Sequence, residues 1–224
     1  MRVGGQNQNF AAWSSFALRP RVLRDVSSVD MSTSVLGAPL DIPVVISSFD
    51  GSELCHPDGE RALVRAAEAE GSAHLVPHLG STRFEELRRV APSTPLFFQL
   101  YAPMVPQSES REMDRDYVSS ALSLLEREGC RGVFVTVDAI NIGNREKTYK
   151  SPAWVAALRR EVGGFPVARS LDGAGLGAHS GHAIPTWEDI NWMVEQTTLP
   201  IVAKGIMTEE DALLAARAGC AGVT

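Results

Sequence analysis

Polar side chains end several apolar runs of this sequence, and their types suit the binding of an anionic or planar ligand. Lys204 follows the apolar residues "PIVA", and Gln99 and Tyr101 stand two residues apart in "FFQLY". Thr136 and Asp138 close the run "VFVTVD". Residues two apart on a strand point to the same face, so the amide and the phenol could contact one planar ligand or be hydrogen-bonded core residues. An unpaired ammonium is costly to bury, so Lys204 is expected to face an anion or to pair with Asp138.

These polar residues are positioned by a regular alternation of apolar runs and amphipathic stretches. The runs that predict strands span residues 43–49, 73–78, 95–101, 132–138 and 200–205, and a further one begins at residue 221. The stretches between them carry apolar residues at positions i, i+3, i+4 and i+7, which is the helical period. Runs that are apolar throughout are typical of strands buried on both faces, so we predict a parallel α/β sheet.

Three threonines mark positions where helices are expected to begin. Thr82, Thr186 and Thr208 are each followed three residues later by an acidic residue. This spacing is typical of a capping box, in which the threonine and the acidic side chain each accept a hydrogen bond from a backbone N–H at the helix start. We therefore predict that a helix begins directly after each of the three.

The sequence Gly-Cys-x-Gly-Val occurs at residues 129–133 and again at 219–223, which favours a closed barrel of equivalent units over an open, doubly wound sheet. We predict a (β/α)8 TIM barrel truncated after about six strands, since a complete barrel has eight. Residues 1–42 are expected to lead into an incomplete barrel over residues 43–224. The insert at residues 141–185 is expected to be a lid or substrate loop, or else a solvated insertion. Such barrels carry their active sites at the carboxyl ends of the strands, where the polar residues stand.

Composition argues against several classes of function. The net charge is -6 and the lysines and arginines are scattered, so no nucleic-acid or membrane partner is expected. No run approaches the roughly 18 uninterrupted apolar residues of a membrane span, which predicts a soluble, cytoplasmic protein. The cysteines are far apart and no histidine stands in a metal-binding or catalytic pattern, so neither a disulfide nor a bound metal is expected.

Several separated segments of the chain resemble one known family. They read "LRPRVLRDVSSVDMSTSVLGAPLDIPVVIS", "HPDGERALVRAAEAEG", "FFQLY", "TVDAINIGNRE" and "LPIVAKGIMTEEDALLAARAGCAGV". In this order, from about Ala17 to Val223, they are similar to the FMN-dependent 2-hydroxy acid oxidases and dehydrogenases, the glycolate oxidase and lactate dehydrogenase flavoproteins. The resemblance implies a barrel of FMN-dependent type, FMN as cofactor and oxidation of a small 2-hydroxy acid to a 2-oxo acid, and it allows a homo-oligomer.

The resemblance implies cofactor-binding roles for four residues. Gln99 and Thr136 match family positions that hydrogen-bond the isoalloxazine ring, and Lys204 matches the lysine placed against flavin N1 and O2. A cation at that position favours the anionic reduced flavin. Ser48 matches the end of the first strand, where this chain has Ser-Phe-Asp at residues 48–50 and the family has Pro-Thr-Ala.

The same resemblance implies catalytic roles for three residues. Tyr101 matches a tyrosine that hydrogen-bonds the substrate, and Asp138 matches an aspartate that pairs with the catalytic histidine. Arg145 matches an arginine that binds the substrate carboxylate, for which a guanidinium offers bidentate geometry.

One family segment has no counterpart in these 224 residues. The Ser-Asn-His-Gly segment, with the catalytic histidine and a second carboxylate-binding arginine, is expected to follow Val223. We therefore expect the chain by itself to bind FMN weakly or not at all and to oxidise little 2-hydroxy acid. The alternative is a non-catalytic truncated barrel, or pseudo-enzyme, that acts through association with another chain. A peroxisomal location would require a targeting signal beyond Thr224.

Overall fold

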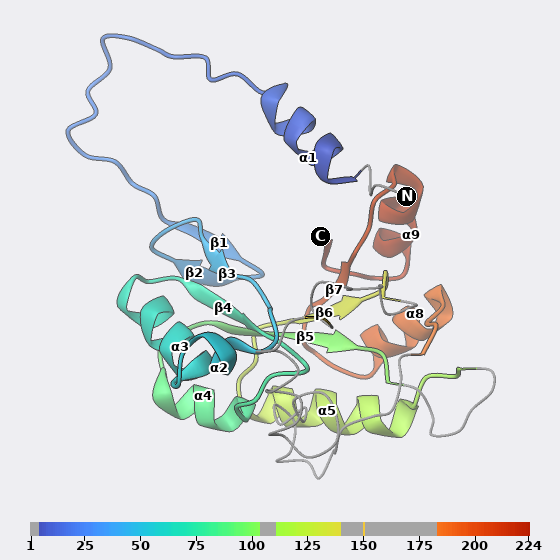
Figure 1. Ribbon diagram of the computed structural model, residues 1–224. Helices are drawn as coiled ribbons and strands as arrows, with labels where there is room; N and C mark the ends of the chain where they lie inside the picture. Colours follow the sequence, from blue (N-terminus) through green and yellow to red (C-terminus); the bar gives the residue numbers. More distant parts are fainter. Residues whose placement is uncertain (1–4, 104–110, 140–149, 151–182) are drawn as a thin grey trace. The chain divides into compact units, whose positions relative to one another are not determined.

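The computed structural model describes residues 5–103, 111–139, 150 and 183–224 (Figure 1). Most of the insert predicted at residues 141–185 lies outside this part of the chain. The chain forms two compact units, Met1–Asp30 and Met31–Thr224. In the first unit, helix α1 spans Gly5–Ser14 and is followed by chain without helix or strand. The second unit contains the described strands and the predicted site residues.

Six parallel strands form the main sheet of the second unit. They are β3 (Val45–Ile46), β4 (Ala73–Val76), β5 (Leu96–Tyr101), β6 (Val133–Thr136), β7 (Ile201–Lys204) and β8 (Gly222–Val223). Each strand pairs with the next one along the chain, so the spatial order follows the sequence order. This is the order of a (β/α) barrel, whereas a doubly wound sheet reverses its order at one point. The prediction of a parallel α/β sheet of barrel type is confirmed.

Helices connect the strands, and α3, α4 and α5 lie along one face of the sheet (Figure 1). The helices of this unit are α2 (Ser52–Cys55), α3 (Gly59–Ala69), α4 (Phe84–Val90), α5 (Arg115–Arg127), α8 (Trp187–Glu195) and α9 (Glu209–Arg217). Phe98, Leu100 and Val133 of the strands share one buried cluster with Leu87 of α4 and Leu122 of α5. Among the described helices, none is long and apolar enough to cross a bilayer.

A short antiparallel hairpin, which was not predicted, precedes the sheet. Its strands β1 (Thr33–Val35) and β2 (Ala38–Leu40) are joined by Leu36 and Gly37, whose φ angles are 48° and 75°. Side chains of β2 pack with side chains of β4 and β5, Phe97 among them, in a second buried cluster. Along β4 and β5, the residues in this second cluster alternate with the residues in the cluster that the helices cover. The hairpin therefore covers the opposite face of the sheet.

Two of the three predicted helix starts are confirmed. Thr186 and Asp189 form a complete capping box at the start of α8. At the start of α9, the Thr208 hydroxyl accepts the backbone N–H of Asp211. Each threonine therefore satisfies a backbone N–H that has no partner inside its helix.

The third predicted helix start is wrong. Helix α4 begins at Phe84, its N-cap residue is Arg83, and no side chain caps it. The reason is a competing acceptor in another element. The backbone N–H of Thr82 donates to the buried carboxylate of Glu60 at 2.8 Å, so Glu60 takes the N–H that a capping box would give to Glu85.

Candidate functional site

Strand register brings four predicted site residues to one face of the sheet. Tyr101 of β5 is the register partner of Thr136 of β6, which is the register partner of Lys204 of β7. Register partners in parallel strands point to the same face, and Gln99 shares it because it lies two residues before Tyr101. All four lie at or near the carboxyl ends of their strands, where barrel enzymes bind their ligands. Gln99, Tyr101, Thr136 and Lys204 are called the polar row below.

The polar row points away from the helices. Phe97 and Phe134 precede Gln99 and Thr136 by two residues and therefore share their face. The centroids of the two phenyl rings are 5.7 Å apart, and both rings belong to the cluster beneath the hairpin. Phe98, which alternates with them, lies in the helix-covered cluster. The polar row therefore lies on the face that would become the interior of a closed barrel.

Gln99 is the buried centre of the polar row. Its side-chain amide donates to Thr136 Oγ1 at 2.8 Å, and its Oε1 accepts the backbone N–H of His78 at 3.3 Å. Gln99 is 3% exposed and Thr136 is 6% exposed. The amide keeps a second N–H and the threonine hydroxyl keeps its own hydrogen, so both side chains can donate to a ligand.

Lys204 and Asp138 lie on neighbouring segments but do not pair. Lys204 is partly exposed and Asp138 is exposed, and among the described ion pairs there is none between them. The alternative of an internal salt bridge therefore gains no support. Asp138 instead packs against Gly205, whose φ is 110° and where a Cβ would overlap the aspartate side chain. Glycine at this position thus leaves the room that Asp138 needs.

Among the described residues, Ser48 is a predicted site residue that the structure does not bring into the polar row. Ser48 follows β3 at the same edge of the sheet, is partly exposed, and forms no described hydrogen bond with the row. The next side chain, Phe49, is 46% exposed. Arg145 lies outside the described residues, so its expected closeness to Tyr101 stays a prediction.

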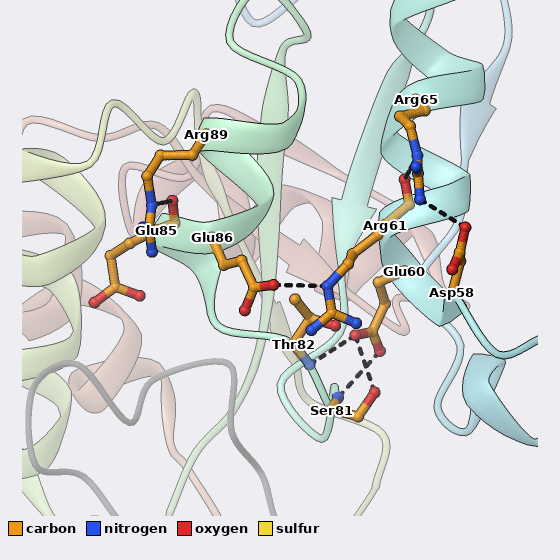
Figure 2. Close-up of polar contacts among 9 residues, drawn as sticks. All are labelled: Asp58, Glu60, Arg61, Arg65, Ser81, Thr82, Glu85, Glu86 and Arg89. Atoms are coloured by element: carbon orange, nitrogen blue, oxygen red, sulfur yellow. Dashed lines mark hydrogen bonds and ion pairs between the residues drawn. The ribbon is translucent and has the colours of Figure 1, made fainter.

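A buried carboxylate without a predicted role holds the loop that follows β4 (Figure 2). Glu60 is 0% exposed and accepts the Ser81 N–H at 3.1 Å, the Ser81 hydroxyl at 3.2 Å and the Thr82 N–H at 2.8 Å. Beside it, a hydrogen-bonded ion pair at 2.6 Å raises the pKa of Arg61 and lowers the pKa of Glu86. The loop leaves β4 at its carboxyl end, so Glu60 fixes the same edge of the sheet that carries the polar row.

Comparisons with known proteins agree with this geometry. Residues 4–224 match the family model described as FMN-dependent dehydrogenase. The chain is 34% identical to peroxisomal (S)-2-hydroxyacid oxidase GLO3 of Arabidopsis thaliana over 221 residues, which are 97% of this chain and 58% of that protein. It is also 34% identical to 2-hydroxyacid oxidase 1 of Homo sapiens over 225 residues, which are 96% of this chain and 58% of that protein.

Solved structures of mandelate oxidase have the same fold. A variant with (S)-mandelic acid superposes with a TM-score of 0.76 at 26% identity, over 96% of this chain and 56% of that one. A variant with a C4a-OH-FMN adduct gives a TM-score of 0.75 at 26% identity, over 96% of this chain and 57% of that one. The chain thus spans 58% of the length of the two curated relatives. Because the family model matches residues 4–224, the chain belongs to the FMN-dependent dehydrogenase family.

Proposed function

We propose that this chain supplies the flavin-ring and substrate-binding residues of an FMN-dependent oxidoreductase that oxidises a small 2-hydroxy acid to the 2-oxo acid. The observation that carries the proposal is the alignment of Tyr101, Thr136 and Lys204 across three neighbouring strands. An amide, a phenol, a hydroxyl and an ammonium thereby share one face at the edge where barrel enzymes act. The relatives named for 2-hydroxy acid and mandelate oxidation support the substrate class.

The polar row fits an isoalloxazine ring, whose polar edge carries several hydrogen-bond acceptors. Gln99 and Thr136 would bind this edge, since each keeps a hydrogen to donate after their mutual hydrogen bond. Lys204 would place its ammonium against the part of the ring where negative charge develops, which electrostatics favours. FMN, when bound, supplies the acceptor for two electrons.

Tyr101 and Asp138 are the described residues proposed to serve the substrate. Tyr101 ends β5 beside Thr136, so its phenol would hydrogen-bond an acid held next to the ring. Asp138 would accept a hydrogen bond from the catalytic histidine that the family resemblance implies, and would keep that imidazole oriented to take the substrate proton. Arg145 stays the predicted partner of the substrate carboxylate.

We expect Lys204→Met to weaken FMN binding about tenfold or more, because a lost charge-assisted hydrogen bond costs about 1.5–3 kcal/mol. Titration of the chain with FMN, followed by flavin fluorescence, measures the ratio of dissociation constants even where the wild-type affinity is low. Arg217→Met is the control, since it removes one positive charge from the exposed end of α9. Equal FMN affinities for wild type and Lys204→Met would contradict the assignment of the ring site.

The substrate class is tested on the same FMN-loaded chain. Glycolate, lactate and mandelate are added in turn, and the absorption spectrum of the flavin is recorded. We expect at least one of these acids to change the spectrum in a saturable way. A flavin spectrum that responds to none of them, in a chain that binds FMN, would favour the non-catalytic alternative over the proposed oxidation.

A further inference from the structure

We propose that His78 is a positioning residue, which holds Tyr101 and the end of β5 where a substrate would be bound. The functional meaning rests on the role proposed for Tyr101 above, whereas the structural contacts can be tested without it. His78 stands two residues beyond the end of β4 and is 5% exposed. No sequence pattern had assigned it a role.

The hydrogen bonds of the His78 ring define its tautomer. The backbone N–H of Tyr101 donates to Nδ1 at 3.0 Å, so Nδ1 carries no hydrogen. In a neutral imidazole the other nitrogen then carries it, and Nε2 lies 3.0 Å from the hydroxyl oxygen of Tyr117, to which it donates. Because both nitrogens contact protein groups, the ring is not placed to take a proton from a substrate. It is placed to fix the backbone of Tyr101.

Three aromatic side chains contact the same ring. His78 stacks on Tyr101 with a centroid distance of 6.1 Å and an interplanar angle of 27°. The ring centroids of Phe98 and Tyr117 lie 5.9 Å and 6.0 Å from the centroid of the imidazole. Tyr117 is itself fixed, since it is 5% exposed and its backbone N–H donates to the Asp114 side chain that caps α5. The packing therefore holds the ring in the orientation that its hydrogen bonds require.

His78 also contacts a residue of the polar row that is proposed to bind the flavin ring. Its backbone N–H donates to Gln99, whose amide donates to Thr136. One residue thus connects the groups proposed for the flavin ring, through its backbone, with the residue proposed for the substrate, through its imidazole. Replacing the imidazole should therefore disturb Tyr101 while the backbone contact to Gln99 is kept.

Two substitutions separate the hydrogen bond of the ring from its packing. His78→Phe keeps an aromatic ring without an acceptor, whereas His78→Asn puts an oxygen close to where Nδ1 lies. We expect hydrogen exchange of the Tyr101 amide, measured by NMR, to quicken about tenfold in His78→Phe and to stay within about threefold of wild type in His78→Asn. Nitrogen-15 spectra of the wild-type chain should show Nε2 protonated and Nδ1 unprotonated.

With FMN present, the two halves of the site should respond differently. We expect His78→Phe to weaken binding of a 2-hydroxy acid about fivefold and to leave the FMN affinity unchanged. Loss of both affinities together would indicate a general structural role and would contradict the proposal.

Unchanged Tyr101 exchange in a folded His78→Phe variant, or a wild-type ring protonated at Nδ1, would also overturn the proposal. Neither measurement needs flavin, so their failure is distinguishable from failure of the Lys204→Met titration. If His78→Phe does not fold, the tautomer in the wild-type chain decides.

Discussion

Glu60→Ala is expected to lower the free energy of unfolding by about 3–4 kcal/mol. The carboxylate is fully buried and accepts hydrogen bonds from Ser81 and Thr82. Alanine leaves two backbone N–H groups and a hydroxyl without this acceptor, and it opens a cavity beside the loop after β4. Urea denaturation, followed by circular dichroism, measures the loss.

Two further variants make this result specific. Glu60→Gln keeps the shape and one acceptor oxygen, so a smaller loss of about 2 kcal/mol is expected. Glu70→Ala removes an exposed carboxylate directly after α3 and should change stability by less than about 0.5 kcal/mol. A loss in Glu60→Ala no larger than that in Glu70→Ala would show that the carboxylate does not anchor the loop.

Acidification is expected to destabilise the chain through His74. Burial lowers the pKa of His74 from the ordinary 6.5 to about 4. Its Nδ1 lies 3.3 Å from the Ile46 carbonyl, and its buried Nε2 has no hydrogen-bond partner among the described groups. The unfolded chain therefore takes up this proton at a higher pH than the folded chain. The contribution of neutral His74 to the free energy of unfolding is fully present above the unfolded pKa, and it is lost as the pH falls from the unfolded pKa to the folded pKa. The loss amounts to about 3 kcal/mol by about pH 4.

His74→Met should remove this part of the pH dependence. We expect the difference in unfolding free energy between wild type and variant to change by about 3 kcal/mol between about pH 7 and about pH 4. Taking the difference cancels the carboxylates that titrate in both proteins. Parallel pH curves for wild type and His74→Met would contradict the low pKa of His74.

The strands and the polar row could be predicted because both depend on local signals. Each strand is an apolar run between two helical stretches, and this pattern alone gives a parallel sheet in sequence order. Side chains two residues apart on a strand point to the same face, so Gln99 and Tyr101 share one face of the sheet. The boundaries were less accurate, since the strand predicted at residues 43–49 is only Val45–Ile46. An edge strand has one partner, so its ends depend on pairing that the apolar run does not reveal.

The contacts that hold the site could not be predicted because they are made between distant elements. His78 and Tyr117 are 39 residues apart, and their contact depends on how α5 packs. The hairpin was missed because Leu36 adopts a φ of 48°, which its residue type does not indicate. Glu60 did leave a signal, since it lies four residues before the buried Val64 and so falls on the buried face of α3. This helical spacing predicts that the acid is buried, but it does not predict which loop the carboxylate binds.

The arginines at the other end of the strands offer a competing place for an anionic flavin. Arg88, Arg127 and Arg131 line a cavity of about 600 Å³ there. Its other lining residues include Pro95, directly before β5, and Gly129, in the turn that leads into β6, so this cavity and the polar row lie at opposite ends of the same strands. Guanidinium groups bind phosphate well, although Arg88 already donates to backbone carbonyls of Glu128 and Thr94. A binding measurement must therefore report position as well as affinity.

NMR mapping of FMN on the isotopically labelled chain tests most directly the central claim, that Gln99, Thr136 and Lys204 of the polar row bind the flavin ring. FMN is added at millimolar concentration, and shifts of the Gln99 side-chain amide and of the Thr136 and Lys204 backbone amides are followed. We expect these signals to move first, and we expect Lys204→Met to reduce their movement at the same FMN concentration. Shifts confined to the cavity lined by the arginines, with none at Gln99, Thr136 or Lys204, would contradict the claim.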